Sequence, residues 1–347
     1  EDFRILTLRS FFIKVVALIL LFILVKTEES IFAYTFVLVL GLAGNSILNL
    51  FLVKSRVKLQ LYSLNFKRHR LPLVFIFSTS VATTIYSTLD TVVLGFLTDE
   101  FQVGLYTAAV KLSKVAIPLV VGLSAVMIPK MANSIESGDY STQIGLLQKS
   151  FRFILFIATP ISMGLFIFRE QFILIFSGTD FLDAAQSMKY LAFLPLFIGL
   201  GYFFGFQILV PYGLNKGLFI ATTGGLLFFG VLNVILTPSS GAKGTAISIF
   251  VAELMVTLFY VAFCPRKIIL ALSWKEMLRC IAIGLIFFPI YKLIQLLGVN
   301  PEIELVLGII FCSGIYFSLH YYLFSSVFVL EGLQMAKSKL SLFKNRL

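Results

Sequence analysis

The sequence predicts an all-α, polytopic membrane protein with about ten transmembrane helices. Of its 347 residues, 59% are hydrophobic and only 13% are charged, and the mean hydropathy is +0.99. A soluble domain is nearer half apolar and a quarter charged, so the excess apolar surface is expected to face lipid. The apolar runs are long and continuous, which favours helices, because a helix pairs its backbone polar groups internally within the bilayer.

A helix that crosses the hydrocarbon core needs about 20 mostly apolar residues. Ten segments satisfy this requirement, at about residues 8–25, 31–53, 71–97, 106–129, 151–168, 190–210, 218–236, 245–263, 278–297 and 303–324. The longest outward connection expected between them is a loop at about residues 169–189.

The positions of the Lys and Arg residues predict the orientation of these segments, because cytoplasmic loops carry an excess of both. One side holds most of the cations, and residues 54–70 alone contain Lys54, Arg56, Lys58, Lys67, Arg68 and Arg70; the opposite side holds only Lys26, Arg169, Lys189 and Lys243. We therefore expect both chain ends to be cytoplasmic. The net charge of +11 then reflects topology, and no nucleic-acid partner is expected.

The loops contain no grouping typical of an enzyme or a metal site. Cys264, Cys280 and Cys312 lack the spacing of a disulfide framework or a zinc site, and His69 and His320 are far apart in the sequence. No catalytic triad or glycine-rich phosphate loop is present. We expect no cofactor and no metal, and any function must lie within the membrane-spanning helices.

A few ionisable residues lie inside the predicted helices: Lys14, Asp90, Lys111, Lys114, Glu253 and Lys292. Each costs about 2.5–3.5 kcal/mol on insertion scales, and such residues generally face a bundle interior or a wet cavity. Lys14 and Lys292 are near enough to helix ends to reach the interface. Lys111 and Lys114 are three residues apart and so share one helix face.

Glu253 lies near the middle of its segment, and a carboxyl group there does not stay charged without a partner, because desolvation disfavours the ionised form. It is a candidate, together with Asp90, for binding a coupling proton or Na⁺. A hydrogen-bonding role within the bundle is the alternative, and we favour that structural role for Glu253.

A polar stripe follows the third segment, where Ser80, Thr84, Ser87 and Thr91 recur at helical spacing. One face of this helix is therefore not expected to contact lipid. Two interpretations remain open: hydrogen bonding between helices, or the lining of a wet lumen.

Several motifs occur in a fixed order along the chain. They are IYSTLDTVVLGF at 85–96, VGLYTAAVK at 103–111, PKM at 129–131, GFQILVPYG at 205–213, and GAKGTA at 241–246 followed by Glu253. Together they resemble the Wzx-type polysaccharide-biosynthesis flippases of the multidrug/oligosaccharidyl-lipid/polysaccharide exporter superfamily. The resemblance extends to about Cys264 and rests on hydropathy alone beyond it.

The resemblance implies a two-lobe fold with a truncated first lobe, because roughly four helices would precede residue 1. On this register, residues 1–53 are the last two helices of the N-terminal lobe and 54–70 a basic cytoplasmic interlobe linker. Residues 71–263 form a six-helix C-terminal lobe, 264–324 an additional helix pair, and 325–347 a basic amphipathic tail. A lipid-facing anchor is the alternative interpretation of 54–70.

The resemblance also implies a function and a location. The protein would move an undecaprenyl-diphosphate-linked oligosaccharide across the bacterial cytoplasmic membrane, in contact with membrane lipid and other polysaccharide-assembly membrane proteins. Lys111, with Lys114 and the polar stripe, would offer positive charge and hydrogen bonds to the diphosphate. The alternative for Lys111 is an intramembrane pair with Asp90.

Two other functions remain open. A cation-coupled multidrug exporter of the same superfamily would use Asp90 and Glu253 without needing a lumen that holds a diphosphate. A membrane-embedded polymerase or glycosyltransferase would need a catalytic loop with clustered Arg, Asp or His, whereas the outward loops here are short and acidic.

Overall fold

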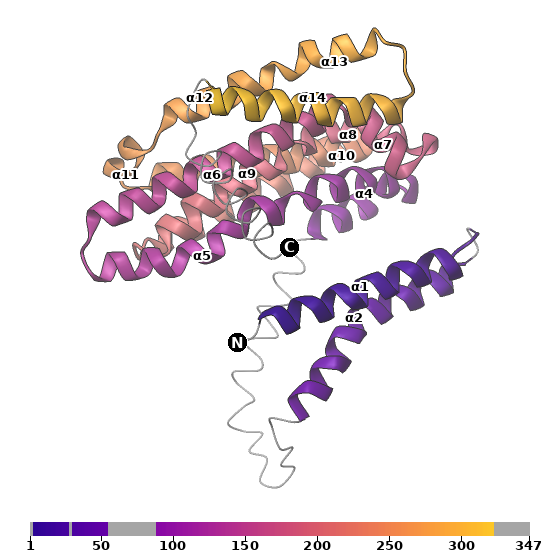
Figure 1. Cartoon of the computed structure of the whole chain (residues 1–347), viewed down its shortest axis with the longest axis horizontal. Coiled ribbons are helices and arrows are strands. Elements are labelled where there is room, and N and C mark those ends of the chain that lie inside the picture. Colours follow the sequence, from indigo (N-terminus) through magenta and orange to yellow (C-terminus); the bar gives the residue numbers. More distant parts are fainter. Residues whose placement is uncertain (1–2, 28–29, 55–87, 323–347) are drawn as a thin grey trace, which may run out of the picture. The chain divides into compact units, whose positions relative to one another are not determined.

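The structure is a computed structural model that describes residues 3–27, 30–54 and 88–322. Every regular element in these ranges is a helix (Figure 1), as the sequence predicts. The chain divides into two compact units, Glu1–Val81 (unit 1) and Ala82–Leu347 (unit 2).

Unit 1 contains a pair of apolar helices, α1 (Phe3–Leu24) and α2 (Ile31–Lys54). Glycine allows them to approach closely, because a Cβ at Gly44 would lie 3.3 Å from Ile13 of α1, and small residues are typical of such contacts in membranes. Many large apolar side chains of the pair are exposed, such as Phe32 at 87%. This is the surface expected of lipid-facing helices.

Unit 2 begins, in its described part, with the helical residues 88–97. It continues with α4 (Glu100–Val115), α5 (Ile117–Glu136), α6 (Tyr140–Ile167), α7 (Arg169–Ser177), η1 (Thr179–Phe181), α8 (Ala184–Leu191), α9 (Leu194–Gly201), η2 (Tyr202–Leu209), α10 (Asn215–Phe263), α11 (Arg266–Ala271), α12 (Trp274–Leu285), α13 (Phe287–Gln295) and α14 (Pro301–Tyr322). In the described part of the chain, six helices are long and apolar enough to cross a membrane, and three shorter apolar helices accompany them. The protein is therefore a multi-pass membrane protein, while the count of ten spans stays a prediction.

α10 consists of two antiparallel arms joined at Gly241. This residue has φ +52° and ψ −134°, a conformation that glycine adopts far more readily than other residues. Thr237 and Thr245 meet across the turn with their Oγ1 atoms 2.9 Å apart, and the Gln102 side chain of α4 accepts a hydrogen bond from the Ala242 N–H at 2.9 Å. The arms correspond to the two expected segments 218–236 and 245–263.

Prolines divide three of the other expected segments. α4 gives way to α5 just before Pro118, α8 to α9 just before Pro195, and α12 to α13 just before Pro289. Proline lacks the N–H that would continue a helical ladder and clashes with the preceding turn. The prediction of a loop at about 169–189 is wrong about its secondary structure. Most of this segment is helical, because it contains α7, η1 and the start of α8.

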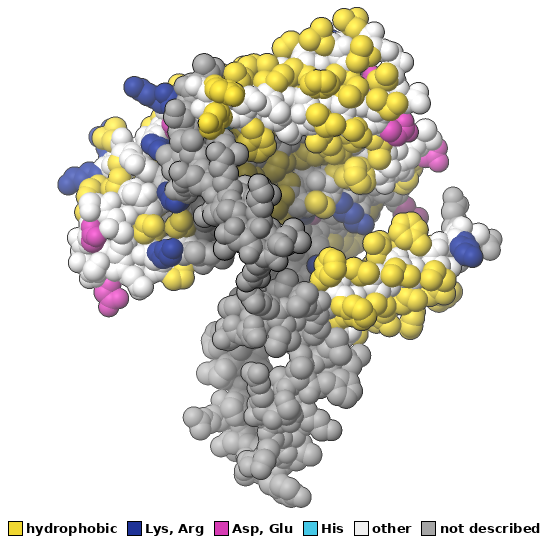
Figure 2. All heavy atoms as spheres, viewed as in Figure 1, with side chains coloured by type: hydrophobic (Ala, Val, Ile, Leu, Met, Phe, Trp, Pro, Cys, Tyr) yellow, Lys and Arg dark blue, Asp and Glu magenta, His cyan; other side chains and the backbone are white. Residues whose placement is uncertain are grey.

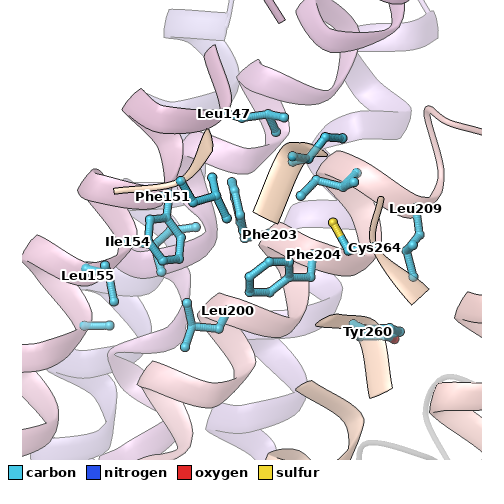
Figure 3. Packing of buried hydrophobic residues seen from close by; sticks show 14 of the residues in the cluster. Leu147, Phe151, Ile154, Leu155, Leu200, Phe203, Phe204, Leu209, Tyr260 and Cys264 are labelled. Carbon is cyan, nitrogen blue, oxygen red and sulfur yellow. The ribbon is translucent and has the colours of Figure 1, made fainter. Parts of the chain in front are cut away.

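The interior of unit 2 is built around aromatic residues of α6 and η2. Phe151 packs against Phe203 with ring centroids 5.2 Å apart and against Trp274 at 5.6 Å. Figure 3 shows Phe151, Phe203 and Phe204 turned toward one another between the ribbons, with Leu200 beside them. These residues fix η2, a π-helix, against α6.

α14 docks on α6 at the site of a helix-breaking residue. Pro160 has no N–H, so it cannot donate to the Phe156 carbonyl within α6. The Tyr316 hydroxyl of α14 donates to that carbonyl at 3.0 Å. Gly308 of α14 lies against the Phe168 ring, where any side chain would collide.

We expect Tyr316→Phe to lower stability by about 1–3 kcal/mol, because the buried Phe156 carbonyl loses the donor that replaces the missing N–H. The measurement is thermal unfolding of the purified protein in detergent. Pro160→Ala supplies an N–H within α6, so adding Tyr316→Phe to Pro160→Ala should cost much less than Tyr316→Phe alone. Equal costs in the two backgrounds would contradict this role of Tyr316.

The outer surface of unit 2 is apolar where α12, α13 and α14 lie together (Figures 1 and 2). Its exposed side chains include Leu278, Leu285, Leu293, Leu296, Val306 and Ile310. Soluble proteins rarely expose apolar patches beyond a few hundred Å². This surface therefore fits contact with lipid chains.

Candidate functional site

Asp90 is the centre of a buried polar network in unit 2. The side chain is 4% exposed. The Tyr106 hydroxyl donates to its Oδ2 at 2.7 Å, and Lys114 Nζ lies 3.4 Å from the same oxygen. The other oxygen, Oδ1, accepts from the Thr91 N–H at 2.8 Å. One carboxyl group thereby contacts a cation and two further donors on helix 88–97 and α4.

The local structure of α4 sets this geometry. Asp99 caps the helix, because its side chain accepts from the Gln102 N–H at 2.8 Å, as expected of an Asp at this position. From this start, Tyr106 and Lys114 are about two turns apart and both reach Asp90. Helix 88–97 and α4 are thereby joined by charge as well as by packing.

A cavity of about 580 Å³ lies beside the network. Its polar lining comes from Thr88, Asp90, Lys114, Tyr202 and Glu253, and apolar residues of α5, α9 and both arms of α10 complete it. Gly225 and Val256, which face each other between the two arms, belong to this apolar wall. The cavity therefore combines a small charged group with a mostly apolar surround.

The ionisable residues that line the cavity differ in whether they have a charged partner. Lys114 is balanced by Asp90, and its side chain is 40% exposed. Glu253 is partly buried and forms no hydrogen bond or ion pair with another residue in the described part of the chain. Among the described residues, the cavity lining thus includes two carboxyl groups and one ammonium group.

The predicted site residues separate into three groups. Asp90, Lys114 and Glu253 line the same cavity, and Thr91 supports Asp90. Lys111 is exposed on α4 outside the lining, and the described cation that contacts Asp90 is Lys114. Ser80, Thr84 and Ser87 lie outside the described residues. The lumen-facing role of Lys111 stays a prediction.

Ionisable groups and one polar stripe do not indicate Tyr106, Thr88 or Tyr202 as site residues. Tyr106 lies within the VGLYTAAVK run, two turns before Lys114. A polar residue about two turns from an intramembrane lysine was the signal that could have identified it. Tyr202 lies in an apolar aromatic run, so nothing in the sequence distinguishes it.

The comparison with known families decides the class of protein. The family described as "Polysaccharide biosynthesis protein" matches residues 1–186, which is more than half of the chain. The chain belongs to this family. This confirms the family-level resemblance drawn from the motifs at 85–96 and 103–111.

Individual relatives agree with the family assignment. A Shigella dysenteriae protein with the provisional name of O-antigen transporter is 24% identical over 262 residues, covering 75% of this chain and 65% of that protein. An uncharacterized membrane protein of Methanocaldococcus jannaschii is 25% identical over 203 residues, covering 57% of this chain and 38% of that protein. The chain thus spans less than two thirds of the length of these relatives.

A solved structure shows the same fold. The lipid II flippase MurJ in an inward closed conformation superposes with a TM-score of 0.65 and 21% sequence identity. The match covers 91% of this chain and 67% of MurJ. At this identity the likeness establishes the fold, and it confirms the exporter-like fold expected from the motifs.

Proposed function

We propose that this protein is part of a flippase that moves undecaprenyl-diphosphate-linked oligosaccharide repeat units across the bacterial cytoplasmic membrane, for O-antigen, capsule or exopolysaccharide. Membership of the polysaccharide biosynthesis family supports the proposal. The observation that carries it is the charged cavity of unit 2, which lies among membrane-spanning helices that also expose many large apolar side chains.

The cavity suits a polar headgroup that has to leave water. Lys114 offers a partly exposed ammonium group, and charge-assisted hydrogen bonds to phosphate are roughly twice as strong as neutral ones. Thr88 and Tyr202 add hydroxyl groups to the same lining. The lipid tail remains in the bilayer, where the apolar surface of unit 2 accommodates it. Lys111 adds an exposed cation on the same helix.

The proposal extends to the organisation of the chain. Residues 1–53 would be the last helices of the first lobe, 54–70 the interlobe linker, 71–263 the second lobe, 264–324 the added helix pair and 325–347 a basic tail. Both ends would be cytoplasmic. Other polysaccharide-assembly membrane proteins are the expected protein partners.

Deletion of the gene in a strain that makes surface polysaccharide tests the proposed function. A flippase defect leaves completed lipid-linked repeat units in the inner leaflet and removes the surface polymer. A polymerase defect instead leaves single repeat units on the outer surface. Unchanged polysaccharide with increased sensitivity to cationic dyes would favour the multidrug exporter.

We further propose that Glu253 binds the coupling ion, a proton or Na⁺. The sequence alone favours a structural role for Glu253 within the helical bundle. In the structure, however, Glu253 forms no hydrogen bond or ion pair with another described residue. Its side chain lines the same cavity as the Asp90–Lys114 pair. Binding at Glu253 would thus be coupled electrostatically to whatever Lys114 holds.

Glu253→Gln keeps the size and hydrogen-bonding capacity of the side chain while removing its ionisation. We expect transport by this variant to lose its dependence on the ion gradient and to fall about tenfold or more, as one lost charge-assisted interaction implies. Transport into proteoliposomes with and without a pH or Na⁺ gradient measures this. Wild-type ion dependence in the variant would return Glu253 to a structural role.

A further inference from the structure

A second charged feature lies on the outside of unit 2, at α11. Arg266, Lys267 and Leu270 are spaced so that they share one face of this helix, and all three are exposed, Leu270 at 80%. Lys275, also exposed, follows at the start of α12. We call these four residues the α11 corner.

The α11 corner is held in a fixed orientation by its buried side. Ile268 and Leu272 are 1% and 5% exposed and belong to the main core. The carbonyl of Ile269 accepts from the Trp274 indole at 2.8 Å, which ties the end of α11 to the start of α12. The three cations and Leu270 therefore project from a rigid support.

Two polar side chains of α6 complete this support. Gln148 donates to the Ala271 carbonyl at 2.7 Å, and Arg152 donates to the Ser273 hydroxyl at 3.0 Å. Since the last carbonyls of a short helix have no partners within it, the Gln148 bond satisfies the Ala271 carbonyl without using the exposed face of α11, and the Arg152 bond holds the start of α12. That face remains available for a ligand.

The exposed face of α12 changes from charged to apolar within one turn. Lys275 is followed by Leu278, 64% exposed, and then Leu285, 52% exposed. Such a change marks the level at which lipid headgroups meet acyl chains, where Lys and Arg place their charge in the polar layer. Figure 2 shows Lys and Arg gathered at this end of unit 2, which Figure 1 identifies by α11 and the α5–α6 turn.

The charge of the α11 corner is not balanced nearby. Glu276 is the neighbouring acidic residue, and it pairs with Arg279 at 2.9 Å. Arg266, Lys267 and Lys275 form no ion pair with any acidic side chain that the structure describes. The corner therefore presents three cations around an exposed leucine.

We propose that the α11 corner binds the phosphodiester headgroup of an anionic phospholipid, with Leu270 and Leu278 against its acyl chains. Juxtamembrane cations attract anionic lipid, and the exposed leucines favour an amphiphile over a free phosphate. The bound lipid would anchor the start of α12. The corner packs on α6 and shares no lining residue with the charged cavity, so this site goes beyond the proposed flippase function.

Native mass spectrometry of the full-length protein, titrated in detergent with phosphatidylglycerol, tests this site. The variant is Arg266→Gln/Lys267→Gln/Lys275→Gln. Its matched control is Lys189→Gln/Lys243→Gln/Lys292→Gln, which removes the same charge from exposed positions elsewhere. We expect the corner variant to bind phosphatidylglycerol about tenfold or more weakly. The control should bind it as the wild type does, and phosphatidylcholine should bind weakly to all three proteins.

Equal phosphatidylglycerol binding by the corner variant and the control would overturn the proposal. Undecaprenyl diphosphate serves as a second probe. If the corner variant lost that ligand and kept phosphatidylglycerol, the corner would belong to the substrate path instead. The single variant Lys267→Gln should show part of the same loss, which keeps the test decisive if the triple variant does not fold.

Discussion

Lys114→Ala in the full-length protein is expected to abolish or sharply reduce surface polysaccharide at unchanged membrane abundance. The change removes the cation that lines the cavity and leaves Asp90, 4% exposed, without its ammonium partner. A hydrogen bond to a charged group contributes about 1.5–3 kcal/mol, which corresponds to roughly a 10- to 100-fold loss of transport. Quantifying surface polymer per copy of membrane-inserted protein measures this effect.

The double variant Asp90→Asn/Lys114→Gln separates two roles of the lysine. It removes both charges together, so no buried carboxylate is left without a partner. If Lys114 holds the substrate diphosphate, transport stays low. If the double variant regained wild-type polysaccharide, Lys114 would only neutralise Asp90, and the substrate role would be wrong. Lys243→Ala, at an exposed position outside the cavity lining, is the control for the loss of one cation.

Gly225→Ala should cause a clear loss of stability in α10. A Cβ at this position would overlap the Val256 side chain of the opposite arm, and overpacking of this kind typically costs about 1–3 kcal/mol. Gly230 lies in the same arm with nothing within 4 Å of its Cβ position. Gly230→Ala should therefore be neutral or stabilising, because alanine favours a helix.

Thermal unfolding in detergent compares the two alanine variants directly. Adding Val256→Ala to Gly225→Ala should restore much of the lost stability, since it removes the group that the new methyl would meet. Similar unfolding temperatures for Gly225→Ala and Gly230→Ala would show that the two arms of α10 do not pack as closely as described. Because Gly225 and Val256 also line the cavity, the rescued protein tests whether cavity shape affects transport.

Hydropathy predicted where the apolar segments lie but not how each helix is built. The segment expected at 151–168 is the apolar half of α6, which begins at Tyr140. Residues 140–150 are mostly polar, so a hydropathy argument stops at the edge of the membrane core while the helix continues. In the segment expected at 190–210, the π-helix η2 depends on the packing of Phe203 and Phe204 on Phe151, and local composition does not report such tertiary contacts.

The site was only partly predictable because it, too, depends on tertiary contacts. Intramembrane charge identified Asp90, Lys114 and Glu253, because uncompensated charge in lipid is expensive enough to imply a special environment. Spacing placed Lys111 and Lys114 on one face but did not show which one reaches Asp90. That choice depends on the rotation of α4 about its axis, which in the structure brings Tyr106 and Lys114 to Asp90.

We propose that the full-length protein transfers a diphosphate-linked oligosaccharide through the charged cavity. Its most direct test is transbilayer movement of a fluorescent undecaprenyl-diphosphate oligosaccharide in proteoliposomes, with wild type and Lys114→Gln reconstituted at equal amounts. We expect wild type to expose the labelled headgroup to an external quencher far faster than protein-free vesicles do, and Lys114→Gln to be slower than wild type by roughly 10- to 100-fold. Equal rates for wild-type and protein-free vesicles, or for wild type and Lys114→Gln, would contradict it.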